Sequence, residues 1–254
     1  MMLIFDYDGV LLNSVVEMGI TAYNTVTGEL ATSPGELPGH TLDLFVGNRY
    51  HVQPAGDALP LMRWCVDHAD LAPAYRLTPE EYLAIRDGAS TPVVERSTQF
   101  FAARRRFVDH DMDKWRSLNS VYQPLWDVLR QKGAHRVVIL TNKNREATLN
   151  LCHHFGLAVS PENVYSGDHG TTKIDNMLSI RRRFNRDDFT FVDDSIGNLA
   201  ELDAHFNANG RTLRLQLASW GYTGPDDERL ARDAGYEYIA QDDLIALLDM
   251  LLPA

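Results

Sequence analysis

The chain has 254 residues, a formal net charge of −11, and ordinary apolar and charged fractions of 44% and 23%. This length allows one large domain or two smaller ones, and the acidic balance argues against general affinity for nucleic acid or anionic membranes. Cys65 and Cys152 are the only cysteines, so neither a disulfide framework nor a thiolate metal site is expected. No apolar run is long enough to span a bilayer, and we expect a cytoplasmic protein that is a monomer or homodimer.

Short apolar runs that end in polar residues predict the strands of a parallel sheet. The clearest runs are Leu3–Phe5, Val137–Leu140 and Phe189–Val192. Weaker strand patterns occupy 163–167, 213–217 and 236–240. Helical patterns lie between the strands and after the last one, at 145–157, 174–184, 196–206 and 242–252. This alternation predicts the α/β class: a Rossmann-like, three-layer α/β/α core with a parallel sheet.

The region from 14 to 119 differs in kind, because it has no comparable β-branched run and is mostly helical in pattern. Residues 78–88 predict a helix in which Thr78 is the N-cap, Pro79 takes the first position and Glu81 completes a capping box. We therefore expect a core built from residues 1–13 and 120–254. An α-helical cap domain, residues 14–119, is inserted after the first strand and would act as a lid that sets substrate choice.

Polar side chains gather where the predicted strands end. Asp6 and Asp8 follow the first strand, Thr141 and Asn142 the second, and Asp193 and Asp194 the third, while Lys173 lies after a weaker one. Open parallel sheets bind ligands beyond the carboxyl ends of their strands. Several close carboxylates cannot all stay ionised without a cation, and oxygen-only ligands favour Mg²⁺.

These residues resemble the four motifs of the haloacid dehalogenase superfamily. The motifs are DYDGV (Asp6–Val10), Thr141, Lys173 and VDDS (Val192–Ser195), and residues 140–157 and 217–224 resemble its phosphoglycolate phosphatase-like branch. The motifs cover the expected core, roughly half of the chain. The resemblance implies a Mg²⁺-dependent phosphatase that hydrolyses a small phosphorylated metabolite, and from the acidic net charge we expect neither nucleic acid nor membrane as a partner.

The resemblance also implies a role for each residue. Asp6 would attack phosphorus and form an aspartyl-phosphate, and Asp8 would protonate the leaving oxygen and then activate water. Thr141, Asn142 and Lys173 would bind the phosphoryl group. The expected metal set is Asp6, Asp8, Asp193, Asp194 and Asn198, in which Asp6 and Asp194 are the main side-chain ligands and either Asp193 or Asn198 completes the site.

Other residues and reactions leave alternatives open. Asp8 argues against a dehalogenase, and the absence of any lysine before Lys114 excludes a phosphonate-cleaving enzyme with a Schiff-base lysine in the inserted region. A phosphomutase of the same superfamily and a non-catalytic module that binds a phosphorylated ligand or protein remain. Arg49 is a candidate contact for an anionic substrate, or a surface arginine. Lys143 is interpreted as the solvated start of a helix, with a second phosphate contact as the alternative.

Overall fold

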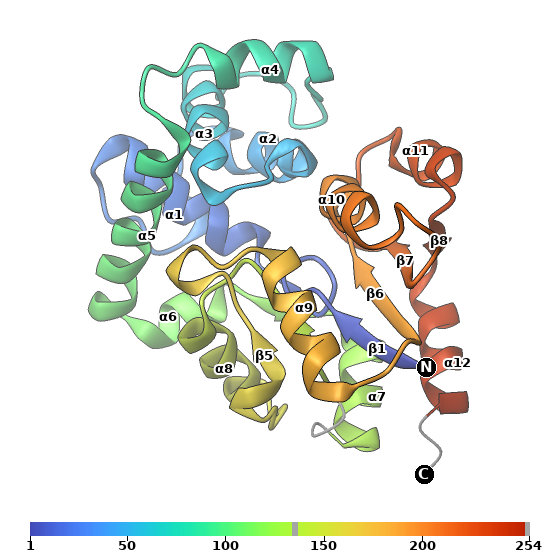
Figure 1. Cartoon of the computed structure of the whole chain (residues 1–254). Helices are drawn as coiled ribbons and strands as arrows, with labels where there is room; N and C mark the ends of the chain where they lie inside the picture. Colours follow the sequence, from blue (N-terminus) through green and yellow to red (C-terminus); the bar gives the residue numbers. More distant parts are fainter. Residues whose placement is uncertain (134–136, 252–254) are drawn as a thin grey trace. The chain divides into compact units, whose positions relative to one another are not determined.

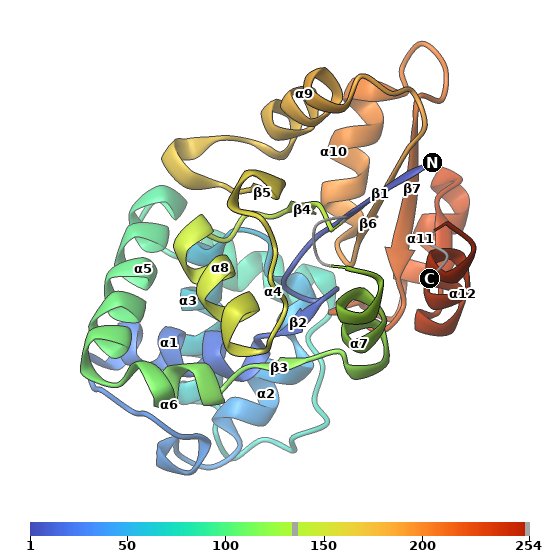
Figure 2. The ribbon, with the colours of Figure 1, turned by 90° about the horizontal axis from the view of Figure 1, so that it is seen from below.

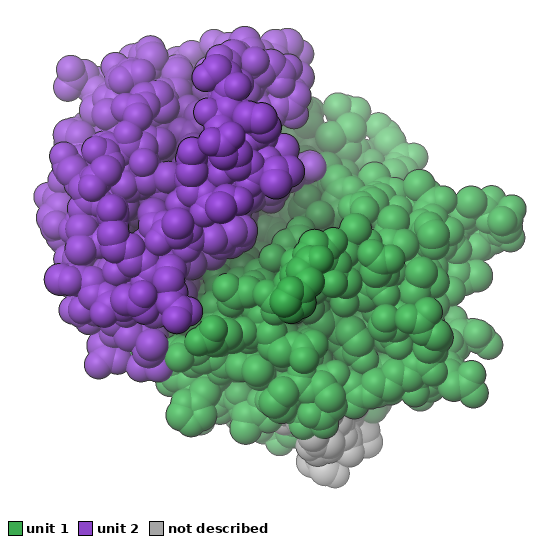
Figure 3. Space-filling view, turned by 60° about the vertical axis from the view of Figure 1, so that its left-hand side comes forward, with its two compact units in different colours: residues 1–13, 121–254 green, residues 14–120 purple. Residues whose placement is uncertain are grey.

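The computed structural model describes residues 1–133 and 137–251. The chain divides into two compact units: unit 1 contains residues 1–13 and 121–254, and unit 2 contains residues 14–120 (Figure 3). A two-stranded sheet of β2 (Leu12–Asn13) and β3 (Ser120–Val121) lies where the chain passes between the units. Among the described residues, no helix combines the length and apolarity that a membrane span requires.

Unit 1 is built on a six-stranded sheet in which every pair of neighbouring strands is parallel (Figure 1). Its order is β5-β4-β1-β6-β7-β8, so the first strand of the chain lies inside the sheet. The strands are β1 (Met2–Phe5), β4 (Ile139–Leu140), β5 (Val164–Tyr165), β6 (Phe189–Asp193), β7 (Leu213–Ala218) and β8 (Glu237–Ile239). The predicted fold class, a Rossmann-like α/β core with a parallel sheet, is confirmed.

Helices cover both faces of this sheet (Figures 1 and 2). Ile4 of β1 and Phe191 of β6 belong to a buried cluster with residues of α9, α10 and α11, which therefore cover one face. The neighbouring residues Leu3 and Phe5 point to the other face, beside α7 and α12. The helices are α7 (Gln123–Lys132), α8 (Arg145–His154), α9 (Lys173–Phe184), α10 (Ile196–Phe206), α11 (Asp227–Ala234) and α12 (Gln241–Leu251).

Unit 2 is helical. Its helices are α1 (Val15–Thr27), α2 (Thr41–Gly47), α3 (Ala58–Asp67), α4 (Pro79–Asp87), α5 (Val93–His110) and α6 (Met112–Ser117). The capping box predicted for α4 is present, because Thr78 Oγ1 accepts from Glu81 N at 3.2 Å and Glu81 Oε2 accepts from Thr78 N at 2.7 Å. α1, α5 and α6 meet at the buried Glu17, whose two carboxylate oxygens accept from Arg104 at 2.8 and 2.7 Å. Trp115 Nε1 donates to the same carboxylate at 2.9 Å.

Candidate active site

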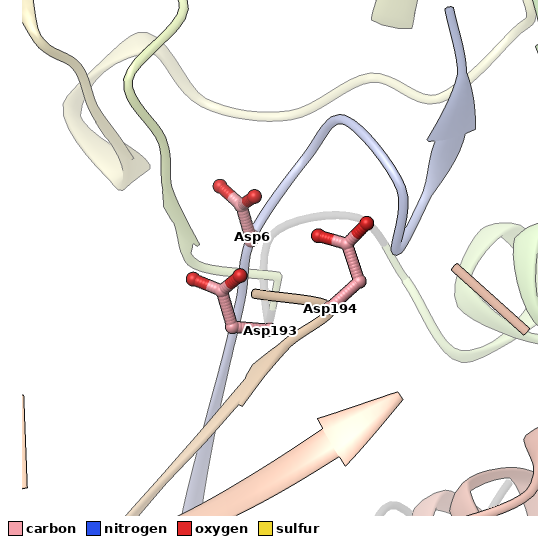
Figure 4. A group of neighbouring side chains, drawn as sticks. All are labelled: Asp6, Asp193 and Asp194. Carbon is pink, nitrogen blue, oxygen red and sulfur yellow. The ribbon is translucent and has the colours of Figure 1, made fainter. Parts of the chain in front are cut away.

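Three carboxylates lie together at the carboxyl ends of β1 and β6. Phe5 is in register with Val192, so Asp6 and Asp193 follow at the same level, and Asp6 N donates to Val192 O at 2.8 Å. Figure 4 shows the side chains of Asp6, Asp193 and Asp194 projecting to the same side of these strand ends. One oxygen from each lies within 4.8 Å of the other two, and all three residues are buried. The sheet thus concentrates negative charge in a small volume.

Lys173 is the buried counter-charge to this cluster. Its Nζ lies 2.5 Å from Asp193 Oδ2 and 3.2 Å from Asp6 Oδ1, and only 2% of the side chain is exposed. Burial alone would lower the pKa of Lys173, but the carboxylates of Asp193 and Asp6 outweigh this effect and raise it. Lys173 begins α9 because Thr172 and Asp175 form a capping box around it. The ammonium group therefore stays charged and faces the place where Asp6 would carry a phosphoryl group.

Asp193 is held by several donors. Besides Lys173, Ser195 N donates to its Oδ1 at 2.9 Å, and Asn198 Nδ2 lies 3.2 and 3.0 Å from its two oxygens. The Asn198 amide nitrogen is thus directed at Asp193. These contacts fix Asp193 mainly as the partner of Lys173 and of the start of α10. Whether Asp193 or Asn198 also contributes to a metal site stays a prediction.

Asp194 is enclosed differently, by two glycines. Its Oδ2 accepts from Tyr222 N at 2.7 Å. A Cβ built on Gly9 would overlap the Asp194 carboxylate, and one on Gly221 would overlap the Asp194 Cβ. Gly9 also has a φ of +87°, a conformation that side chains with a Cβ rarely adopt. The sequence pattern around 217–224 carries a resemblance to the phosphoglycolate phosphatase-like branch, but it gives no sign that this loop would hold Asp194.

The acid cluster fits a divalent cation. Burial is the largest cause that raises the pKa of Asp6 well above its ordinary value; Lys173 opposes it, and the charges of Asp193, Asp194 and Asp8 add to it. Asp6 Oδ1 approaches Lys173, but without hydrogen-bond geometry, so this buried oxygen has no hydrogen bond within the described part of the chain. Oxygen donors of this charge suit Mg²⁺, for which Asp6 and Asp194 would be the ligands.

Thr141 and Asn142 follow β4 at the same edge of the sheet. Thr141 is 2% exposed, its N–H donates to Tyr165 O at 2.9 Å, and its Oγ1 accepts from Lys143 N at 3.1 Å. Because the hydroxyl accepts in that bond, its own proton can be donated to a phosphoryl oxygen. Asn142 is exposed, and its backbone lies close to Gly167, where a Cβ would come within 2.8 Å of Asn142 O. Their binding of phosphate stays a prediction.

Asp8 has a partner that the sequence did not indicate. Lys143 Nζ lies 3.0 Å from Asp8 Oδ1 and 3.4 Å from Asp8 Oδ2. The side chain of Lys143 is 2% exposed, whereas that of Asp8 is 23% exposed. The interpretation of Lys143 as a solvated helix start is therefore wrong: α8 begins two residues later, at Arg145, with Asn144 as its N-cap.

Arg49 lies in unit 2, within a short 3₁₀ turn at Arg49–His51. It is partly buried, and its Nη1 donates to Val52 O at 2.5 Å. The expected contact between Arg49 and an anionic substrate stays a prediction. All the other residues expected to act on phosphate or metal belong to unit 1.

Comparisons with known proteins identify the fold. No protein-family model matches the chain, and no curated protein is similar enough in sequence to count as a relative. Several solved structures do match over almost the whole chain, at low sequence identity. A predicted phosphoglycolate phosphatase from Haemophilus somnus has a TM-score of 0.59 and 17% identity, with 98% of this chain and 96% of that chain covered.

Two further solved structures extend this finding. A haloacid dehalogenase-like hydrolase from Streptococcus pneumoniae has a TM-score of 0.55 and 13% identity, with coverage of 98% and 97% of the two chains. Protein Tyrosine Kinase A from Mycobacterium tuberculosis has a TM-score of 0.58 and 16% identity, with coverage of 100% and 98%. At this identity the likeness concerns the fold alone: the chain has the fold that haloacid dehalogenase-like hydrolases and phosphoglycolate phosphatase-like proteins share.

Proposed function

We propose that this chain, which has the haloacid dehalogenase-like fold, is a Mg²⁺-dependent phosphatase that hydrolyses a small phosphate monoester through an aspartyl-phosphate on Asp6. The observation that carries the proposal is the buried group at the ends of β1 and β6. There the carboxylates of Asp6, Asp193 and Asp194 lie within 4.8 Å of one another, and Lys173 lies beside Asp6. The fold of hydrolases and phosphatases named in the comparisons supports this choice of reaction.

In the first half-reaction, an oxygen of Asp6 attacks phosphorus and the bond to the leaving oxygen breaks. Asp8 donates a proton to that oxygen, and a positioned acid of this kind contributes about 10²–10⁴-fold to the rate. Lys173 and Thr141 hold the phosphoryl oxygens as their charge shifts during the transfer. A bound Mg²⁺ would neutralise part of the cluster's charge and polarise the phosphoryl group.

The second half-reaction returns Asp6 to its free form. Asp8 accepts a proton from water, the water oxygen attacks phosphorus, and the bond between phosphorus and the Asp6 oxygen breaks. Inorganic phosphate leaves, and the electron pair of the broken bond remains on the Asp6 carboxylate. Residues of unit 1 would perform all of these steps, so we assign the choice of leaving group to unit 2, residues 14–120.

The test is the release of inorganic phosphate from a panel of phosphate monoesters, with Mg²⁺ and with a chelator. We expect release in Mg²⁺ alone and none from Asp6→Asn. Asp187→Asn is the matched control, because Asp187 is an exposed aspartate outside the cluster and its variant should remain active. Metal-independent release, or turnover by Asp6→Asn, would contradict the proposal.

The same assay separates the two alternatives. A phosphomutase would convert one sugar phosphate into its isomer and release little inorganic phosphate. A non-catalytic module would bind a phosphorylated ligand without either reaction, and would not form a beryllofluoride adduct on Asp6. The fold does not distinguish hydrolysis from other phosphoryl transfers, since the neighbour from Mycobacterium tuberculosis is named a kinase.

A further inference from the structure

Lys143 is a buried lysine in the candidate site that the proposed mechanism leaves without a role. Its side chain is 2% exposed, and its Nζ lies 3.0 and 3.4 Å from the two oxygens of Asp8. A buried ammonium group is costly unless it is paired, so its placement requires the Asp8 carboxylate. Lys143 and Asp8 are 135 positions apart in the sequence, and the fold brings them together.

Local structure fixes the position of Lys143. Its N–H donates to Thr141 Oγ1 at 3.1 Å, so the turn after β4 is tied to the hydroxyl expected to hold phosphate. The next residue, Asn144, caps α8 through a 2.7 Å hydrogen bond from Ala147 N to its Oδ1. The base of the Lys143 side chain is thus held on both sides, and its ammonium end can act as a fixed point for Asp8.

We propose that Lys143 is a positioning residue that holds the Asp8 carboxylate in place to accept a proton from water while the aspartyl-phosphate on Asp6 is hydrolysed. The inference rests on the proposed function. Lys143 Nζ contacts both oxygens of Asp8, at 3.0 and 3.4 Å, and so fixes the direction of the group that takes the proton from water in the second half-reaction. With the ammonium in contact with both oxygens, the carboxylate loses rotational freedom before water arrives.

The proposal predicts which step slows when the ammonium group is removed. With a substrate whose leaving oxygen needs little protonation by Asp8, phosphate transfer to Asp6 continues in Lys143→Met, but hydrolysis of the aspartyl-phosphate becomes slow and the intermediate accumulates. kcat should fall on the order of tenfold or more, since a positioned base contributes about 10²–10⁴-fold. KM should fall by a similar factor, which leaves kcat/KM close to the wild-type value.

The experiment is rapid-mixing kinetics of the full chain with p-nitrophenyl phosphate and Mg²⁺. This substrate has a good leaving group, so its cleavage depends little on proton donation by Asp8. We expect Lys143→Met to release a burst of p-nitrophenol approaching one equivalent per chain, followed by slow turnover, and to retain acid-stable phosphate on Asp6. Lys143→Arg, which keeps the charge, should restore much of the steady-state rate.

Lys132→Met is the matched control. Lys132 belongs to the same unit and pairs with Asp249 at 2.9 Å, outside the acid cluster, so its variant should show wild-type kinetics. Thermal melting and circular dichroism check the fold of each variant. If Lys143→Met does not fold, Lys143→Gln takes its place, because its amide removes the charge and keeps a hydrogen-bond donor.

The possible failures are distinguishable. A wild-type chain that neither releases phosphate nor forms an aspartyl-phosphate overturns the proposed function itself. An active wild type whose Lys143→Met variant has a smaller burst and a lower kcat/KM shows a merely structural role, and overturns only the positioning role. Unchanged kinetics in that variant overturn it as well.

Discussion

Lys173 Nζ lies 2.5 Å from Asp193 Oδ2, closer than its 3.2 Å approach to Asp6 Oδ1. Asp193, the last residue of β6, and Asp194, which follows it, therefore have different surroundings. Asp193 accepts from Lys173, Ser195 and Asn198, whereas Asp194 accepts from the backbone of Tyr222 and is enclosed by Gly9 and Gly221. The sequence alone does not distinguish the roles of these two aspartates. In the structure, Asp193 is the partner of Lys173, and Asp194 is the candidate metal ligand.

This division predicts different defects in Asp193→Asn and Asp194→Asn. Asp194→Asn should raise the Mg²⁺ concentration needed for half-maximal phosphate release by about tenfold or more. Asp193→Asn should lower activity at saturating Mg²⁺ by about 10–100-fold, as loss of a supporting residue does, with a smaller change in the Mg²⁺ requirement. Phosphate release as a function of Mg²⁺ measures both. Equal shifts of the Mg²⁺ requirement in the two variants would contradict this division.

Gly221→Ala should disturb Asp194 by steric overlap alone. Its Cβ would collide with the Asp194 Cβ, and Gly221 does not have a left-handed φ, so backbone strain adds nothing. Overpacking of this kind costs about 1–3 kcal/mol of stability, and we expect weaker Mg²⁺ activation as well. Gly35→Ala is the control, since a Cβ there has nothing within 4 Å. Melting temperature and Mg²⁺ titration give the result, and two indistinguishable variants would count against the steric argument.

Glu17→Ala should strongly destabilise unit 2. The substitution removes the carboxylate that pairs with Arg104 and Trp115, and leaves a buried guanidinium without its charged partner. Breaking a buried pair in this way costs about 3–5 kcal/mol. Asp109→Ala is the matched control, because its pair with Arg105 is 63–67% exposed and such pairs contribute about 0–1 kcal/mol. Urea unfolding followed by circular dichroism compares them, and similar midpoints would refute the difference.

Asp175 should make the stability of α9 depend on pH. Hydrogen bonds from the Thr172 side chain and N–H lower the pKa of Asp175 below its ordinary value. A lowered folded-state pKa stabilises the fold above the unfolded value of about 3.9, and this contribution is lost as the pH falls through the folded value. Asp175→Asn should therefore lower the melting temperature at pH 7, and by less below about pH 4.

The control for this prediction removes the donor instead of the acceptor. In a Thr172→Ala background, the hydroxyl that lowers the Asp175 pKa is missing, so Asp175→Asn should have a smaller effect with weaker pH dependence. Melting temperatures of the four chains at both pH values complete the comparison. A larger effect of Asp175→Asn in acid would reverse the expected sign and reject the interpretation.

The strands, and the placement of Asp6, Asp193 and Asp194 at the strand ends, could be predicted from the sequence, because both depend on local patterns. β1, β6, β7 and β8 lie within a residue or two of the apolar runs that indicated them. β4 is shorter than expected: Ile139–Leu140 pair with neighbouring strands, while Val137 and Val138 are buried outside the assigned strand. Helix α11 was not predicted, since its sequence DERLARDA is mostly polar and buries little besides Ala231.

Contacts between residues that lie far apart in the sequence could not be predicted from it. A lysine just before a helix is usually solvated, and nothing near Lys143 indicates that its partner is Asp8 in the first strand's loop. The contacts of Asp194 with the Tyr222 N–H and the two glycines could not be predicted either. Every residue other than proline has a backbone N–H, and a glycine has no side chain whose chemistry would indicate a partner. Local motifs thus predicted which residues lie together at the edge of the sheet, but not which of them contact one another.

Because β1 lies inside the sheet, the sheet of unit 1 can pair only late in synthesis on the ribosome. β1 is synthesised before its two neighbours, β4 and β6, which begin at Ile139 and Phe189. Unit 2 is continuous from 14 to 120, so all of it is synthesised before either neighbour exists. All of unit 2 can therefore be synthesised while β1, which Asp6 directly follows, still lacks both of its neighbours in the sheet, and the cluster of Asp6, Asp193 and Asp194 can form only after residue 194 has been added.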